Sequence, residues 1–128
     1  MRFFTVLLVL CSISLNAQDY PKGTSSITIE NGLTAEQNYR HIGQALLEKG
    51  YEIETNSDFY TIKTLPRREG RFNMYYYFTC MEGRARITGQ YNIPGIPGWS
   101  EIENVGMKKS PAKLAFAALV EASTLISG

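Results

Sequence analysis

The chain has little of the chemistry on which most enzymes and metal sites depend. Its 128 residues include one histidine, two cysteines and one tryptophan. A structural metal site needs three or four converging ligands, and a catalytic nucleophile needs a base beside it. The scarce candidates for such roles are His41, Cys80, Glu101 and Glu103. They do not form a recognisable set, so we expect no catalytic residues, no metal and no cofactor.

A charge excess is also missing. The chain carries 13 basic and 12 acidic residues, which gives a formal net charge of +1. Proteins that neutralise nucleic-acid phosphates usually carry a marked basic excess. Three arginines fall in one predicted loop (Arg67, Arg68 and Arg71), whereas Arg84 and Arg86 lie a strand length away. The composition therefore argues against nucleic acid as a partner.

Long apolar runs are absent except at the N-terminus. Residues 1–17 contain one positive charge, an apolar run of about Phe3 to Leu15, and Ala17 before a polar residue. This pattern is typical of a secretory signal peptide. The run is shorter than the ~20 residues that span a bilayer, so no stable membrane span is expected after cleavage. We predict export to the periplasm or the extracellular space, and a single domain over residues 18–128.

Removal of the signal segment changes both the cysteine count and the charge. Cys11 leaves with it, so Cys80 remains alone and cannot form an internal disulfide. Loss of Arg2 leaves 12 basic residues against 12 acidic ones. Lipidation of Cys11 would need a small residue before it, and Leu10 stands there, so a lipoprotein is not expected.

The first structural elements after the signal are a strand and a helix. Apolar and polar residues alternate over Ser25–Glu30, which predicts a strand. Thr34 followed by Gln37 is a capping-box pattern, and it predicts the start of a helix. Gly50 lies where that helix is expected to end.

Two β-hairpins are predicted next, with turns at Ser57-Asp58 and Glu82-Gly83. In the first hairpin, the predicted register pairs Ile53 with Ile62 and Glu52 with Lys63. In the second hairpin, it pairs Phe78 with Ile87, Tyr76 with Gly89 and Met74 with Tyr91. Both registers place the apolar residues on one face, as a correct register must. The second hairpin is longer and more aromatic, so we expect it at the centre of the sheet.

The last part of the chain combines an irregular loop with an apolar helix. Two Pro-Gly steps break any strand between Asn92 and Lys109, where Ser100–Asn104 is expected to form one helical turn. Ser110-Pro111 predicts the start of a helix that runs to about Ile126. That helix contains only two charged residues. It should therefore be largely buried or have a partner.

These segments predict an α+β fold with an antiparallel five-stranded sheet in the order β-α-β-β-β-β-α. Both helices would pack on one face of the sheet. This order resembles that of the TATA-box-binding-protein-like fold. The export signal ending in Ala17-Gln18 and the Gly-Met-Lys-Lys-Ser-Pro-Ala-Lys run at 106–113 are similar to small exported Bacteroidota proteins of unknown function. The resemblance implies a fold but no catalytic residues.

The open face of the predicted sheet is the best candidate for a binding site. Aromatic rings beside cations and amides are typical of surfaces that bind protein, sugar or peptide. The candidate residues are Tyr75, Tyr77, Arg86, Gln90 and Lys63, with Trp99 from the irregular loop. The same composition also suits an ordinary solvated sheet face. Trp99 is either an interface anchor or, with Ile102, a plug over an open end of the core.

The sequence thus predicts an exported envelope protein that acts as a non-catalytic binding or protein-interaction module. Its partner would be another envelope protein or a small ligand. Two alternatives remain open. One is a small periplasmic enzyme of the hydrolase type. The other is a self-associating structural subunit that uses the last helix or the sheet face as its seam.

Overall fold

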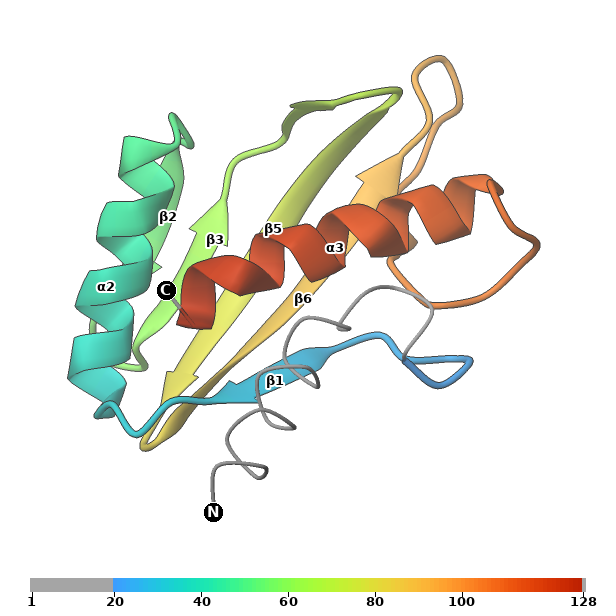
Figure 1. Cartoon of the computed structure of the whole chain (residues 1–128). Coiled ribbons are helices and arrows are strands. Elements are labelled where there is room, and N and C mark those ends of the chain that lie inside the picture. Colours follow the sequence, from blue (N-terminus) through green and yellow to red (C-terminus); the bar gives the residue numbers. More distant parts are fainter. Residues whose placement is uncertain (1–19, 128) are drawn as a thin grey trace.

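The structure is a computed structural model that describes residues 20–127, and it shows two helices lying across one face of a twisted sheet (Figure 1). Its elements are β1 (Ile27–Glu30), α2 (Ala35–Glu48), β2 (Ile53–Asn56), β3 (Thr61–Thr64), β4 (Arg67–Glu69), β5 (Phe72–Met81), β6 (Arg84–Asn92), β7 (Ser100–Glu101) and α3 (Pro111–Ser127). The predicted signal segment, with Cys11, lies outside the described residues. Neither of the two described helices is long and apolar enough to cross a membrane.

The sheet is antiparallel, and its strand order is β1-β6-β5-β3-β2. The predicted α+β class, the two helices on one face and the central position of the second hairpin are confirmed. The predicted count of five strands is wrong, because residues 20–127 form a sheet of seven. The additional strands are β4, which pairs with β5, and β7, which pairs with β6.

Both additional strands are short segments that pair with long neighbours. Strand β5 has 10 residues and β3 has only four, so β3 leaves the first half of β5 without a partner on that side. Arg67–Glu69 fills this gap, although it was predicted as a loop. Ser100–Glu101 pairs with Gln90 and Tyr91 instead of forming the predicted helical turn. Neither segment has enough apolar alternation to predict a strand.

The two hairpin registers differ in outcome. In the second hairpin Phe78 lies opposite Ile87 and Tyr76 opposite Gly89, as predicted. In the first, Ile53 lies opposite Thr64 instead of Ile62. The shift of two residues keeps every side chain on its predicted face.

The shifted register follows from the turn between β2 and β3, which spans four residues and not two. Asn56 Oδ1 accepts hydrogen bonds from the backbone N–H groups of Asp58 and Phe59 at 3.0 and 3.4 Å. Tyr60 adopts a positive φ of 52°. An asparagine that holds its own turn in this way favours a longer loop than the two-residue turn assumed from the sequence.

Helix α2 begins as predicted. Thr34 Oγ1 accepts from the Gln37 N–H at 3.1 Å, and Gln37 Oε1 accepts from the Thr34 N–H at 2.9 Å. Ile42 and Leu46 are fully buried against the sheet. Asn38 is also fully buried, and its amide donates to the carbonyls of Met81 and Arg84 at 3.1 and 3.2 Å. This side chain joins the helix to the β5–β6 turn.

Helix α3 lies diagonally across the sheet beside α2 (Figure 1). Its inward side buries Phe116, Leu119 and Ile126. Its outer side leaves Leu114 38% exposed, with Ala117 and Glu121 also at the surface. The helix is therefore half in the core and half open, and its open side is unusually apolar.

Candidate functional site

The open face of the sheet carries a shallow depression of about 520 Å³. It is lined by Lys63, Tyr75, Tyr77, Thr88, Gly89, Gln90 and Glu101. The register explains this gathering, because Lys63, Tyr77 and Thr88 lie side by side on β3, β5 and β6. Tyr75, Gln90 and Glu101 form the next row. We call Lys63, Tyr75, Tyr77, Gln90, Trp99 and Glu101 the open-face cluster.

The aromatic rings of the open-face cluster are in contact with one another and with a cation. The Trp99 indole meets the Tyr75 ring edge-on, with centroids 5.0 Å apart and planes inclined at 68°. The Lys63 ammonium lies 4.9 Å from the centroid of the Tyr75 ring. Edge-to-face and cation–π contacts of this kind orient side chains that would otherwise be mobile. Tyr77 and Trp99 remain 40% and 42% exposed.

Most of the residues predicted for this site lie together. Lys63, Tyr75, Tyr77 and Gln90 line the depression, and Trp99 reaches it through its contact with Tyr75. Trp99 is thus a surface residue, while Ile102 is completely buried and forms the core plug.

Arg86 and Glu101 relate to the depression differently from what the sequence suggested. Arg86 lies on the open face as predicted but does not line the depression, since it lies beside Thr28 and Thr79 towards the start of β6. Glu101 lines the depression although it was assigned to a loop without a partner. The pairing of β7 with β6 places it there, and no apolar pattern in the sequence indicated that pairing.

Within residues 20–127, the polar side chains of the open-face cluster have no hydrogen-bond partner in the protein. Among the residues that the structure describes, no side-chain hydrogen bond involves the Lys63 ammonium, the Tyr77 hydroxyl or the Gln90 amide. The Glu101 carboxylate and the Trp99 indole N–H have none within this part of the chain either. These donors and acceptors remain available to a bound molecule.

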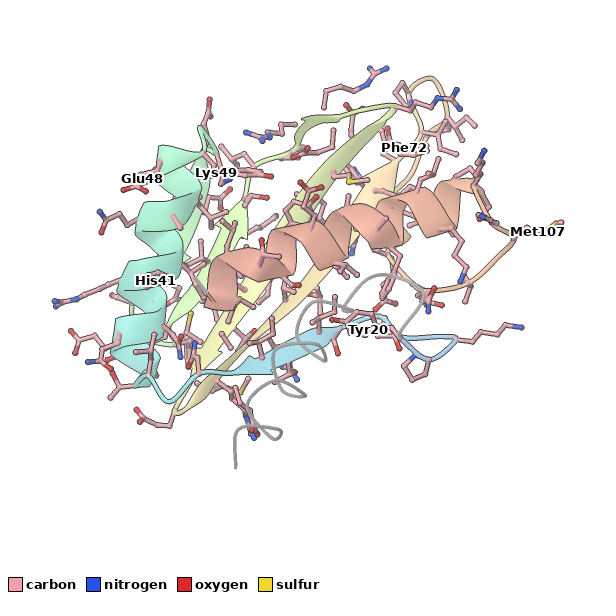
Figure 2. The ribbon with its side chains drawn as sticks, in the orientation of Figure 1. Tyr20, His41, Glu48, Lys49, Phe72 and Met107 are labelled. Carbon is pink, nitrogen blue, oxygen red and sulfur yellow. The ribbon has the colours of Figure 1, made fainter. Side chains whose placement is uncertain are left out.

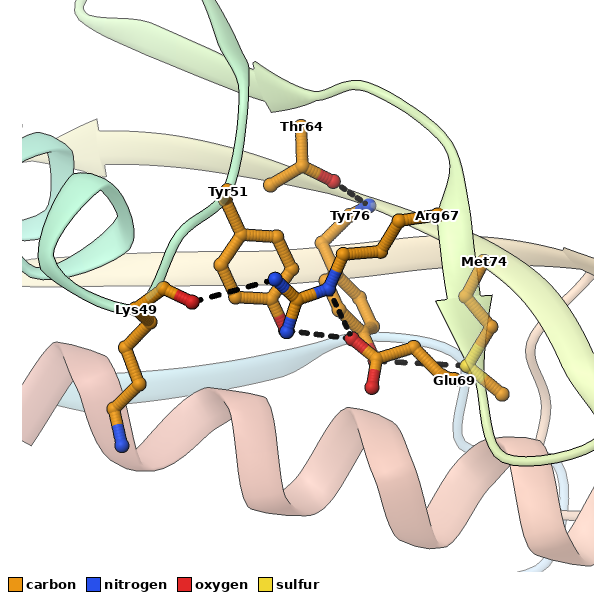
Figure 3. Close-up of polar contacts among 7 residues, drawn as sticks. All are labelled: Lys49, Tyr51, Thr64, Arg67, Glu69, Met74 and Tyr76. Atoms are coloured by element: carbon orange, nitrogen blue, oxygen red, sulfur yellow. Dashed lines mark hydrogen bonds and ion pairs between the residues drawn. The ribbon is translucent and has the colours of Figure 1, made fainter.

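A second polar cluster, not predicted from the sequence, lies on the helix side of the sheet (Figure 3). Glu69 Oε1 accepts from the Tyr51 hydroxyl at 2.8 Å and from Arg67 Nε at 3.0 Å. The Arg67 guanidinium carbon lies 3.6 Å from the centroid of the Tyr51 ring. Arg67 also donates to the Lys49 carbonyl at 3.3 Å. We call Tyr51, Arg67 and Glu69 the covered network.

The covered network lies beside the buried Tyr76 and lines a cavity of about 210 Å³. Burial raises the pKa of the Tyr51 hydroxyl to about 12, and its hydrogen bond to Glu69 adds to this shift. Burial also raises the pKa of Tyr76, whose hydroxyl donates to Met74 Sδ at 3.5 Å. Both phenols therefore stay protonated at neutral pH, and they act as hydrogen-bond donors and not as bases.

The scarce cysteine and histidine do not form a reactive pair. Cys80 is 4% exposed on the helix side of β5, and burial raises the pKa of its thiol to about 11. A buried thiol of this kind is usually unreactive. His41 lies on α2 and is half-buried (Figure 2). No group of three or more potential metal ligands occurs among residues 20–127.

The protein is thus a two-layer α+β protein, with both helices on one face of the sheet and a shallow depression on the other face. No protein-family model matches the chain, and no characterised protein matches its sequence. Among solved structures it resembles a TBP-like protein from Parabacteroides distasonis, with 15% identity over 80% of this chain and 86% of that one, and a TM-score of 0.44. It also resembles a DUF4468 family protein from Bacteroides ovatus, with 12% identity over 78% of this chain and 79% of that one, and a TM-score of 0.39.

These neighbours, a TBP-like protein and a DUF4468 family protein, both come from Bacteroidales and agree with the predicted resemblance to TBP-like Bacteroidota proteins. At such identities and TM-scores they carry no information on the site.

Proposed function

We propose that the protein is exported to the bacterial envelope and acts there as a non-catalytic binding module. Its partner contacts the open-face cluster. The observation that carries this proposal is the convergence of three aromatic side chains with unused polar groups around one depression of about 520 Å³. Tyrosine and tryptophan supply large contact areas at a low entropic cost, which makes them common anchors of binding surfaces.

The arrangement favours a protein partner. Tyr75 and Tyr77 lie on the central strand β5, and Trp99 packs against the Tyr75 ring, while Lys63 on β3 and Glu101 on β7 supply charges of both signs at the sides. An apolar centre with a polar rim is the usual anatomy of a protein–protein interface. The depression is shallow and broad, so it suits a surface or a peptide better than a fully enclosed small molecule.

Site-specific crosslinking tests this proposal. A photoreactive phenylalanine replaces Tyr77 in one version of the protein and Phe59 in another, and both are expressed in the native host. Phe59 is 73% exposed in the turn between β2 and β3, so it is a matched aromatic control. We expect one dominant crosslinked protein from position 77, and its loss when Trp99→Ser is added.

Three outcomes would count against the proposal. Identical adducts from positions 59 and 77 would indicate non-specific contact. Adducts that survive Trp99→Ser would remove the open-face cluster as the contact surface. Crosslinks only to a second copy of the chain would favour the self-associating subunit.

Export is tested separately. We expect the protein purified from the envelope fraction to begin at Gln18, because Ala17 precedes the predicted cleavage site. Deletion of residues 2–17 should leave the protein in the cytoplasm. Recovery of an uncleaved chain from the cytoplasm of wild-type cells would contradict this part of the proposal.

A further inference from the structure

A second depression lies at the end of the molecule where three segments meet. They are the β4–β5 turn, the start of the loop after β6 and the first turn of α3. Phe72, at the start of β5, marks this end (Figure 2). The depression has a volume of about 450 Å³. It is lined by Arg68, Arg71, Phe72, Ile93, Pro94, Lys109, Pro111 and Leu114.

The lining of this depression is entirely cationic or apolar. Its three charged residues are Arg68, Arg71 and Lys109, and no acidic side chain is among them. Within the described chain, no side-chain hydrogen bond involves Arg71 or the Lys109 ammonium. Arg68 is held only by its Nε–H, which donates to the Gly70 carbonyl at 3.1 Å. Cations gathered at a concave apolar surface attract and retain an anion.

Nearby acidity does not cancel these charges. Glu69 lies in the same turn, but its Oε1 already accepts from both Tyr51 and Arg67. The start of α3 adds the positive end of a 17-residue helix at Pro111. The depression is therefore a site of positive potential.

The depression continues into a neighbouring one of about 420 Å³, and the two share Arg71, Phe72 and Leu114. Met74, Ala117 and Ala118 extend the apolar lining along α3. From Pro111 to Ala118 the helix rises by about 10 Å. Glu121 closes the far end with negative charge, and Glu69, which is ion-paired with Arg67, adds a polar side chain there. We call the two depressions together the basic-ended groove.

We propose that the basic-ended groove binds one molecule of an anionic amphiphile, an acidic headgroup with a single apolar chain of medium length. The headgroup lies among Arg68, Arg71 and Lys109. The chain follows Phe72 and Leu114 towards Ala118, and the Glu121 carboxylate at the far end limits its length. Because the surface is a concave trough, it matches one chain better than the flat face of a bilayer. The groove lies beside α3 on the helix side, so this proposal does not depend on the open-face cluster.

Binding of decanoate below its micellar concentration, measured by titration calorimetry on the protein lacking residues 1–17, tests this proposal. Decanol and acetate serve as probes of the chain and the headgroup alone. We expect decanoate to bind at least ten times more tightly than decanol, and acetate to show no binding. Arg71→Gln with Lys109→Asn should weaken decanoate binding at least tenfold. Asparagine tolerates the positive φ of 67° at position 109, so this variant keeps the fold.

A matched charge control is Arg84→Gln with Arg86→Gln, at the other end of the sheet. It should leave decanoate binding unchanged. Leu114→Asp should abolish binding of the chain, while Leu47→Asp on α2, where Leu47 is 59% exposed, should not. Each variant is checked for an unchanged thermal midpoint.

Equal binding of decanol and decanoate would overturn the role of the cations. Equal losses of decanoate affinity in the groove variants and in their controls would show that decanoate does not bind in the basic-ended groove. Binding to anionic phospholipid vesicles without binding of decanoate would replace the single-molecule site by a membrane-docking surface.

Discussion

The open-face cluster and the covered network contain the same pair of groups, a tyrosine ring with a cation over it. Lys63 lies 4.9 Å from the Tyr75 ring centroid on the open face, and Arg67 lies 3.6 Å from the Tyr51 ring centroid on the helix side. In the covered network the cation and the hydroxyl are both bound to Glu69. On the open face the corresponding groups have no side-chain hydrogen bond among the described residues.

The role of such a pair therefore depends on its hydrogen-bond partners and not on its composition. Donors and acceptors that satisfy one another hold the fold together, as where Arg67 links β4 to the end of α2 through Lys49. Donors and acceptors that face water are hydrogen-bonded to solvent, and a bound partner can replace those hydrogen bonds. We therefore expect substitutions in the covered region to change stability, and substitutions in the open-face cluster to change binding.

Neighbouring tyrosines on opposite faces give the largest contrast. Tyr76 is 2% exposed among core residues, whereas Tyr77 is 40% exposed on the open face. Tyr76→Ala should lower the free energy of unfolding by about 3–5 kcal/mol, as for other large buried aromatic residues. Tyr77→Ala should lower it by less than about 1 kcal/mol. Urea denaturation of both variants measures the difference, and similar losses would remove the distinction between the two faces.

A substitution at Gly89 should give the next largest loss of stability, because Gly89 lies between the core and the open face. Its backbone lines the open-face depression, but a Cβ there would lie 2.8 Å from Ile102 Cδ1 and 3.0 Å from the Tyr75 carbonyl oxygen. Gly89→Ala should therefore cost about 1–3 kcal/mol of stability through overpacking. Thr88→Ala is the adjacent control and should cost less. A Gly89→Ala protein as stable as the wild type would show that this contact relaxes freely.

The covered network should contribute a smaller amount to the free energy of unfolding. Glu69→Ala removes the acceptor of both Tyr51 and Arg67, and we expect a loss of about 1 kcal/mol because the pair is partly exposed. Glu54 is the matched control, since it lies opposite Lys63 on the outer strand β2. Glu54→Ala should change stability by less than about 0.5 kcal/mol. Chemical denaturation distinguishes the two, and equal losses would deny the network a structural role.

The smallest effect concerns alkaline pH. The pKa of Tyr51 is about 12 in the folded protein and lies near 10 for a tyrosine in an unfolded chain. Because the folded value is raised, the contribution of this hydroxyl is complete below pH 10 and is lost as the pH rises towards 12.

Wild-type protein should therefore lose more stability between about pH 9 and about pH 11 than Tyr51→Phe does. Tyr75→Phe, which removes an open-face hydroxyl, is the control. Denaturation midpoints at both pH values provide the measurement. An identical loss of stability in wild-type protein and Tyr51→Phe would show that the raised pKa of Tyr51 has no effect on folding.

The sequence predicts the structure well where side-chain periodicity carries the information. Alternation along residues 72–81 separates Tyr76 and Phe78 from Tyr75 and Tyr77, and this places Tyr75 and Tyr77 on the open face. The Thr34 capping box and the register of the second hairpin follow from equally local patterns. These features need no knowledge of distant contacts.

The sequence does not predict the structure where backbone pairing alone decides it. Strands β4 and β7 consist of three and two mostly polar residues, and only the free flanks of β5 and β6 make them strands. Their formation places Glu101 in the open-face cluster and Arg67 over Tyr51. No residue pattern predicts such contacts, since they depend on the assembled sheet.

We propose that the open-face cluster binds a partner and contributes little to the fold. The most direct test is to titrate the protein recovered by crosslinking at Tyr77 against wild-type protein and against the double variant Tyr77→Ser with Trp99→Ser. We predict at least tenfold weaker binding by the variant, with a thermal midpoint within about 2 °C of the wild type. Unchanged affinity, or a weakened affinity that merely accompanies unfolding, would contradict the claim.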